Sequence, residues 1–219
     1  MYLLSSLYRS LASLISPPFC AYCGQFLATR LHLCHPCRSY MQPLATVTIP
    51  VTAKYQVKLF SASAYREPLK SLVLAKSRRD HVASAQLGQL IWQLTDIRNI
   101  PFDYVIPIPL HWRRYATRGY NQATEIARVI AHESGTHLLD ALVRIKHRPF
   151  QSHVRSDERQ GNVAGAFILR PAYKQILKDK KILLVDDLYT SGATMKVAAR
   201  ELIRARPAQL SAVVACRRC

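Results

Sequence analysis

A run of aliphatic residues that ends in two adjacent aspartates constrains the fold of this chain more than any other feature. Residues 181–189 read KILLVDDLY, and residues 190–194 read TSGAT. An unbroken aliphatic run is typical of a strand buried on both faces of a parallel sheet, and small residues around a glycine favour a turn into the next helix. The stretch therefore predicts a central strand, Lys181–Val185, whose carboxyl end presents Asp186 and Asp187.

The segments around this strand alternate between extended and helical patterns, which predicts an α/β fold with a mostly parallel sheet. Apolar residues recur at helical spacing within 87–94, 123–130 and 197–203. Strand-like stretches occupy 55–65, 103–109 and 209–216, and further extended stretches lie around a basic loop within 142–170.

Residues 41–54 are rich in threonine, proline and small residues and show no helical period, so we interpret them as a linker or a crossing segment. We expect two units on either side of it. An amino-terminal helix and a four-cysteine module would occupy 1–50, and the larger domain would occupy 51–219.

The first cysteines form two C-x-x-C pairs, which are Cys20–Cys23 and Cys34–Cys37. Two such pairs can place four sulfurs at the corners of a tetrahedron, the geometry that structural Zn²⁺ accepts. A segment this small needs such a staple, so we predict a zinc-ribbon-like module. Two disulfides are the alternative and would need an oxidising compartment. His32 or His35 could replace a ligand.

The amino terminus and the last cysteines are less specific. Residues 3–15 repeat leucine and isoleucine on one helical face, with Arg9 in the middle and no basic region before them, so we expect a short amphipathic helix rather than a signal peptide. Without an export signal or a membrane-length apolar run, the expected location is cytoplasmic. Cys216 continues an apolar run, so we expect it to be a buried thiol on a strand, and Cys219 is the last residue of the sequence. A redox pair or a metal site formed by these two cysteines is left open.

The charge balance favours a polyanionic partner. The chain has 31 Lys+Arg against 13 Asp+Glu, a formal net charge of +18. In the stretch HWRRYATRGYN, aromatic residues interleave with arginines, as in sequence-tolerant binding of single-stranded DNA. The alternatives are core aromatics beside a solvated basic loop. The residues concerned are Trp112, Arg113, Arg114, Tyr115, Arg118 and Tyr120.

The turn after the aspartates has the composition of an anion site. Backbone N–H groups and the helix dipole would hold a phosphate, and Gly192 would allow close approach. The two carboxylates would repel that phosphate, so they must face hydroxyls or a divalent cation of the same ligand. Ribose 5-phosphate has this arrangement of groups.

Residues 181–194 resemble the phosphoribosyl-diphosphate signature of type I phosphoribosyltransferases. Together with 105–128, Gln151, 159–167 and the paired cysteines, the chain resembles the ComF/GntX family over essentially its whole length. The resemblance implies a zinc module before a phosphoribosyltransferase-like domain. It also implies a role in natural transformation, in which incoming single-stranded DNA is handled in the cytoplasm beside a competence helicase or other uptake proteins.

By that resemblance, Asp186 and Asp187 hold the ribose hydroxyls of phosphoribosyl diphosphate, bound with Mg²⁺. The 5-phosphate would contact Thr190, Ser191, Gly192, Ala193 and Thr194.

Transfer at the ribose would also require cations for the diphosphate and a site for the acceptor. Arg113, Arg114 and Arg118 are candidates for the diphosphate, and Arg159 lies on a loop that could close over the site. We find no acceptor pocket, since little chain follows the last strand. A metabolic phosphoribosyltransferase with an unknown acceptor is therefore one alternative, and a non-catalytic phosphosugar sensor or scaffold, or an idle pocket, is another.

Overall fold

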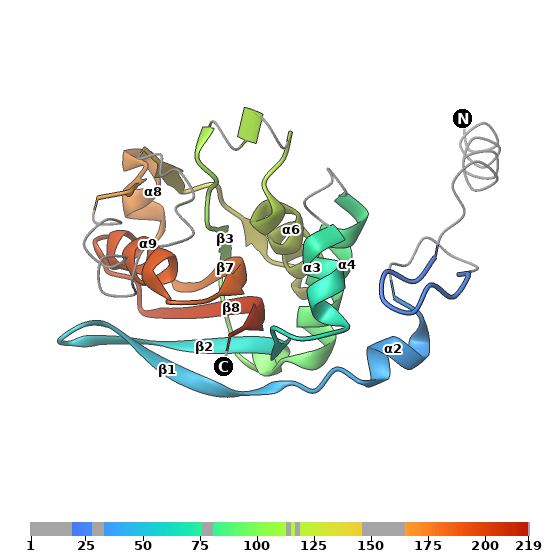
Figure 1. Ribbon diagram of the computed structural model, residues 1–219. Coiled ribbons are helices and arrows are strands. Elements are labelled where there is room, and N and C mark those ends of the chain that lie inside the picture. The colour runs from blue at the N-terminus through green and yellow to red at the C-terminus, as the bar shows by residue number, and fades with distance from the viewer. Residues whose placement is uncertain are drawn as a thin grey trace.

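The computed structural model describes residues 19–27, 33–75, 81–112, 115–116, 119–145 and 165–218. These residues form a six-stranded sheet with helices on both faces (Figure 1). From edge to edge its strands are β1 (Leu44–Thr52), β2 (Tyr55–Ala64), β8 (Gln209–Arg217), β7 (Lys181–Tyr189), β3 (Tyr104–Pro107) and β4 (His137–Leu138). All neighbouring strands are parallel except β1 and β2, so the predicted mostly parallel α/β sheet is confirmed.

Helices pack on the two faces of the sheet, as Figure 1 shows. One face is covered by α3 (Leu69–Ala75), α4 (His81–Leu94) and α6 (Gln122–Ser134), and the other by α9 (Ala193–Ile203). The shorter elements are α2 (His35–Ser39), η2 (Asp96–Asn99), α8 (Pro171–Ile176) and an antiparallel pair of β5 (Leu142–Arg144) with β6 (Phe167–Leu169).

Strand β7 supplies both halves of the core. Leu183 and Val185 belong to the apolar cluster under α4 and α6, whereas Ile182 and Leu184 belong to the cluster under α9. This alternation follows from the period of two in an extended chain. The prediction that the aliphatic run is a central strand buried on both faces is therefore confirmed.

The interpretation of residues 41–54 as a linker is wrong. Most of that stretch is β1, which pairs antiparallel with β2 at the edge of the sheet. Its Ile49 and Val51 are buried while Thr48, Pro50 and Thr52 are exposed, so a period-two pattern was present among the threonines. Pro50 is tolerated because an edge strand has one side without a ladder partner.

Helix α6 shows how the chain near the carboxyl edge of the sheet is fixed. Asn121 caps the helix by accepting a hydrogen bond from the Ala123 N–H at 3.2 Å, and it also donates to the Ile108 carbonyl at 3.0 Å. Gly135 ends the helix in the left-handed conformation with φ 67°. The loop that follows β3 is thereby tied to the start of α6.

Some predictions concern residues outside the described part of the chain. These are the amphipathic helix within 1–18, His32, Arg113, Arg114, Arg118, Gln151, Arg159 and Cys219. Among the described residues, no helix is both long enough and apolar enough to cross a lipid bilayer.

Candidate functional site

The aspartate pair lies at the carboxyl end of β7, in the middle of the sheet between β8 and β3. The strand is longer than the aliphatic run, because it continues through both aspartates to Tyr189. Both side chains are partly buried, and Asp186 Oδ1 accepts a hydrogen bond from the Asp187 N–H at 2.9 Å. The backbone below is also fixed, since the Cys216 thiol lies 3.8 Å from the Asp187 carbonyl oxygen as a weak donor.

The turn after β7 leads directly into α9. Gly192 has φ 72° and ψ 0°, is the N-cap of the helix, and accepts a hydrogen bond from the Lys196 N–H at 2.9 Å. A Cβ at this position would lie 2.3 Å from the Tyr189 hydroxyl oxygen. Glycine is therefore required both because a side chain would clash with Tyr189 and because φ is positive. The exposed Thr190 and Ser191 precede it, and Ala193 and Thr194 form the first turn of α9.

These residues line one small hollow. Asp186 and all of 190–194 border it, so the structure brings one predicted sugar ligand together with the predicted phosphate ligands. The N-terminal N–H groups of an eleven-residue helix point at an anion placed there, and the helix dipole favours negative charge. The arrangement can hold a phosphate on the turn and hydroxyl groups on the Asp186 carboxylate, whereas Asp187 does not border the hollow.

Tyr189 also borders the hollow and was missed by sequence reasoning. Burial raises the pKa of its hydroxyl, and the nearby charge of Arg217 opposes the shift in part. The group is therefore protonated at neutral pH and can donate a hydrogen bond. An aromatic residue directly before a hydroxyl-rich turn was the signal that could have identified it.

The structure separates the three predicted nucleic-acid aromatics. Trp112 and Tyr115 are 64% and 53% exposed on the loop after β3. Tyr120 is 3% exposed; its ring stacks on His81 at 4.0 Å, and its hydroxyl lies 3.3 Å from Ser84 Oγ. Tyr120 therefore supports α4 against α6 and offers no free ring face to a base.

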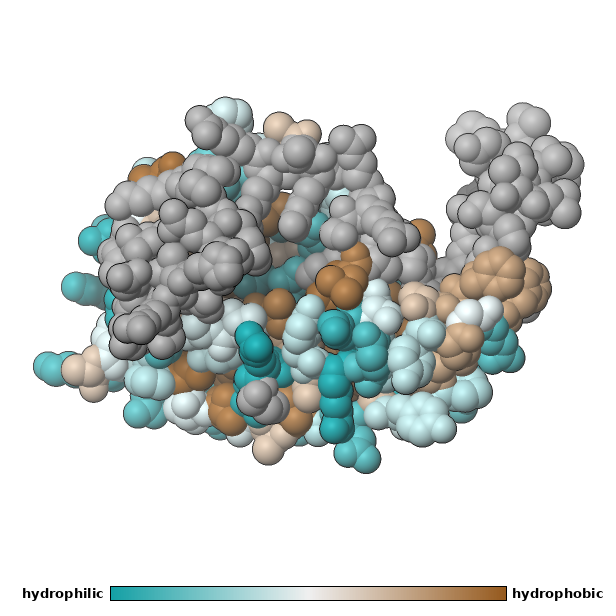
Figure 2. All heavy atoms as spheres, viewed as in Figure 1, coloured by the Kyte–Doolittle hydropathy of each residue, from teal (hydrophilic) through white to brown (hydrophobic). Residues whose placement is uncertain are grey.

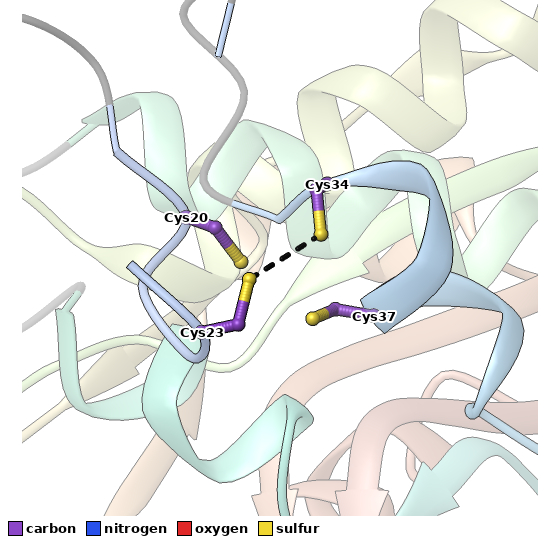
Figure 3. Close-up of side chains that lie close together, drawn as sticks. All are labelled: Cys20, Cys23, Cys34 and Cys37. Atoms are coloured by element: carbon purple, nitrogen blue, oxygen red, sulfur yellow. Dashed lines mark hydrogen bonds between the residues drawn. The ribbon is translucent and has the colours of Figure 1, made fainter. Parts of the chain in front are cut away.

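The four amino-terminal cysteines converge on one point (Figure 3). Their sulfurs all lie within 4.8 Å of one another, and the Cys23 and Cys34 sulfurs are 3.6 Å apart. A tetrahedral Zn²⁺ with bonds of about 2.3 Å requires sulfur–sulfur distances of about 3.8 Å. The donor set and its size therefore fit a structural metal such as zinc. No disulfide joins these cysteines, and His35 lies outside the cluster.

The two pairs reach the cluster differently. Cys20 and Cys23 are on a tight turn closed by the Cys20 N–H, which donates to the Gln25 carbonyl at 2.8 Å. Cys34 is the N-cap of α2 and Cys37 lies inside this helix, so the second pair is in a helical turn.

The thiols have unequal acidity in the absence of a cation. Burial raises the pKa of Cys20, but hydrogen bonds from the backbone of Cys23, Cys34 and Tyr22 outweigh it and lower the value to about 6. For Cys37, burial and the neighbouring sulfurs both raise the pKa. Because four adjacent thiolates repel one another, a divalent cation is needed to hold all four deprotonated.

The cysteine module contacts the larger domain through α4. Leu33 and Met41 belong to the same apolar cluster as Leu87 and Leu90, and Arg38 Nη2 donates to Gln93 Oε1 at 2.5 Å. The module also exposes aromatic side chains, namely Phe19, Tyr22, Phe26 and Tyr40. Figure 2 shows apolar surface at this end of the molecule.

The comparisons with known proteins agree with this geometry. Residues 116–219 match the phosphoribosyl transferase domain family, and the match contains β7, the turn and α9. The chain is 28% identical to the DNA utilization protein YhgH of Salmonella typhimurium, covering 90% of this chain and 89% of that protein. It is 26% identical to Competence protein F of Haemophilus influenzae, over 84% of this chain and 78% of the relative.

A third relative is similar over a shorter stretch. Competence protein ComFC of Streptococcus pneumoniae is 38% identical over 94 residues, which cover 43% of this chain and 38% of that protein.

Fold, turn and cysteine cluster together define a phosphoribosyltransferase-type domain preceded by a four-cysteine module. Over most of its length the chain is a distant homologue of the ComF/YhgH competence proteins, and its carboxyl-terminal part matches the phosphoribosyl transferase domain. The family resemblance drawn from the sequence is confirmed.

Proposed function

We propose that this chain acts in natural transformation, where it handles incoming single-stranded DNA in the cytoplasm and binds phosphoribosyl diphosphate with Mg²⁺. The observation that carries the proposal is the pair Asp186–Asp187 at the end of the central strand, followed at once by the Gly192 turn at the start of α9. The names of two relatives, a competence protein and a DNA utilization protein, support the biological setting.

Each group of the ligand has a chemical counterpart in the site. The N–H groups of the turn and the hydroxyls of Thr190, Ser191 and Thr194 are donors for the 5-phosphate. The carboxylates of Asp186 and Asp187 accept hydrogen bonds from the ribose hydroxyls. Their oxygens are also the ligand type that Mg²⁺ prefers, and the ion would neutralise charge on the diphosphate.

The DNA part of the proposal rests on charge and exposed rings. A net charge of +18 attracts a polyanion, and Trp112 and Tyr115 offer exposed faces on which bases can stack. Arg113, Arg114 and Arg118 share this loop and would contact strand phosphates or the diphosphate, and Arg159 would join them from the loop within 142–170.

Protein partners would meet the cysteine module. Its exposed aromatics give an apolar surface of the kind used in protein contacts, and a competence helicase or another uptake protein is the partner class we propose. The metal would hold this surface in shape and would take no part in the chemistry of the sugar site.

A metabolic phosphoribosyltransferase is the second candidate function. It is favoured by a separate cavity that Trp112 and Tyr115 line beside the sheet edge, which could receive a small acceptor. Release of diphosphate from phosphoribosyl diphosphate on addition of a base or amine would distinguish this candidate from a binding protein.

The experiment that tests the proposal is complementation of a deletion strain. Wild-type protein should restore transformation, and Asp186→Ala with Asp187→Ala should not, while both proteins accumulate to the same level. Equal restoration by both proteins would mean that transformation does not need the sugar site. A strain whose deletion leaves transformation unchanged would remove the proposed role altogether.

A further inference from the structure

A groove lies between the cysteine module and α4, which Figure 1 shows beside each other. It encloses a cavity of about 330 Å³. Leu33 of the module and Leu90 of α4 line it as buried residues, and Val82 lines it as a residue that is 38% exposed. The groove shares no lining residue with the hollow at the Gly192 turn, so it is separate from the proposed sugar site. The remaining lining residues are Arg38, Ala85, Gln86 and Gln89.

Helix α4 presents no charged side chain to this groove. Asp, Glu, Lys and Arg make up 20% of the chain, yet none of them occurs among the 14 residues of α4. Its exposed positions include Val82 and the amides Gln89 and Gln93. A surface helix normally carries charged residues on the side away from the core. We therefore interpret the uncharged side of α4 as one that another element covers.

The segment that precedes the cysteine module has an apolar face of matching length. As a helix, residues 3–15 would be about 20 Å long, and the residues of α4 span about 21 Å. Serines and Arg9 would lie on the opposite face of the segment. Residues 1–18 are outside the described part of the chain. The apolar face consists of Leu3, Leu4, Leu7, Leu11, Leu14 and Ile15.

The described chain begins next to the groove. The Cys20 and Cys34 sulfurs lie within 4.8 Å of each other, and Cys34 directly follows Leu33 of the groove. Phe19 is held by a bridge to Phe26, with the two ring centres 6.0 Å apart. Only three residues, two of them prolines, separate Phe19 from the apolar segment. A tether this short gives about millimolar effective concentration, so even a weak contact would keep the segment bound.

We propose that residues 3–15 dock in this groove as an amphipathic helix that lies along α4. The apolar face of the segment would contact Leu33, Val82 and Leu90, and the burial of its leucines would stabilise the contact. The docked segment would fasten the cysteine module to α4 by a contact that does not involve the metal. The inference goes beyond the proposed function, because it needs neither the sugar ligand nor DNA.

Two other occupants are less well matched. A second copy of the chain would have to meet the same patch across a two-fold axis, but a concave surface does not fill its own copy. A net charge of +18 on each protomer also opposes this association. A lipid surface would take the segment away from the groove. Helices that lie in anionic membranes are rich in Lys and Arg on their polar face, whereas Arg9 is the single cation of residues 1–29.

Trypsin measures docking in the full-length protein, because Arg9 is the only Lys or Arg before Arg30. Cleavage after Arg9 removes residues 1–9, and mass spectrometry identifies this loss. When opening is fast, the cleavage rate follows the population of the open form. We expect cleavage to be about tenfold slower than in a free peptide of residues 1–18, as for a segment that is open about a tenth of the time.

The first pair of variants changes the segment. Leu7→Gln with Leu11→Gln removes two leucines from the apolar face, so cleavage should become as fast as in a free peptide with the same substitutions. Ser6→Gln with Ser13→Gln is the matched control on the opposite face, and the protection should remain about tenfold. Neither variant alters residues 19–218, so a faster cleavage cannot arise from misfolding of the described structure.

The second pair of variants changes the groove. Val82→Gln with Ala85→Gln places two polar side chains in it and should abolish the protection of Arg9. Val82 is exposed and Ala85 half-buried, and glutamine is a good helix former, so the fold should be kept. The matched control is Ala172→Gln with Ile176→Gln, at exposed positions of α8 outside the groove, which should leave the cleavage rate unchanged.

Equal cleavage rates for the wild type and the free peptide would overturn the proposal, and so would protection that survives either disruptive pair. Protection that rises with protein concentration would assign the segment to a second copy. Protection that appears only with vesicles of phosphatidylglycerol and phosphatidylcholine would assign it to a membrane surface. Each of these two results contradicts docking in the groove beside α4.

Discussion

The cysteine module and the sheet domain differ in what holds them together. The described part of the module buries few side chains, and half of these are sulfur ligands; they are Cys20, Leu27, Leu33, Cys34, Cys37 and Met41. The sheet domain has two apolar clusters, one on each face of β7. We therefore expect the module to depend on a metal for its fold, whereas the proposed sugar site depends on the sheet.

The difference means that the two regions should fail independently. Loss of the metal should open the module and leave the Gly192 turn in place, because the turn is fixed by β7, β8 and α9. Loss of core packing should weaken the turn and leave the cysteine ligands intact. The following experiments try to break that separation.

Removal of a metal ligand should have the largest effect. Cys34→Ser should abolish zinc binding and expose residues 19–41 to protease, because a structural zinc contributes about 10–16 kcal/mol to the folding of small zinc-binding peptides. Metal analysis and limited proteolysis measure this. Cys216→Ala is the matched control, since this buried thiol of β8 lies outside the cluster and should leave zinc content near one ion per chain.

A substitution that creates a cavity in the core should have the next largest effect, and it should lower the stability of the sheet domain only. Leu184→Ala should lower the free energy of unfolding by about 2–5 kcal/mol, because this fully buried side chain leaves a hole that its neighbours cannot fill. Zinc content should not change. Leu74→Ala, which is 52% exposed on α3, should cost less than about 0.5 kcal/mol in the same urea titration.

Substitution of Gly192 sharpens the comparison at the site itself. Gly192→Ala should abolish ligand binding. It should also lower the free energy of unfolding by more than Gly135→Ala does. Both glycines have φ near +70°, for which an alanine pays about 1–2 kcal/mol, but only Gly192 of the two has side-chain atoms within 4 Å, those of Tyr189. The difference between the two variants in urea unfolding isolates the contact with Tyr189. Equal losses would mean that the tyrosine moves aside freely.

The smallest effect concerns DNA and salt. Affinity for a single strand should fall with salt by about 0.7 log units per log unit for each phosphate neutralised, and Arg114→Ala should reduce the slope by about that amount. Trp112→Ala should weaken binding by about 1–3 kcal/mol without changing the slope, since stacking releases few ions. Anisotropy titrations at several salt concentrations measure both. One affinity and one slope for all proteins would assign binding to diffuse surface charge.

The sequence predicted best where local pattern and final environment agree. The aliphatic run of β7 and the helical periods of α4 and α6 each depend on neighbours in the chain, and both predictions were correct. The strand β1 was missed because threonines and a proline obscure its period of two, and because only its last residues alternate clearly between buried and exposed.

Tertiary contacts account for what sequence could not supply. Tyr120 has the same context as Trp112 and Tyr115, and its burial against His81 depends on how α4 meets α6. The contact of Tyr189 with Gly192 could not be predicted from the spacing of these residues in the sequence. The cavity near Trp112 combines residues of 109–124 with Asp140, residues 142–144 and Arg170, which are separated in the chain and lie together through tertiary contacts such as the β5–β6 pair.

The most direct test of the central claim is a thermal melt of the protein with phosphoribosyl diphosphate and Mg²⁺. A ligand that binds only the native state adds about 2.7 kcal/mol at a hundred times its dissociation constant, so the midpoint of the sheet domain should rise. Asp186→Asn with Asp187→Asn should abolish the rise, and Cys34→Ser should retain it. No rise for the wild type at millimolar ligand, or an equal rise for the double aspartate variant, would contradict a sugar site at the end of β7.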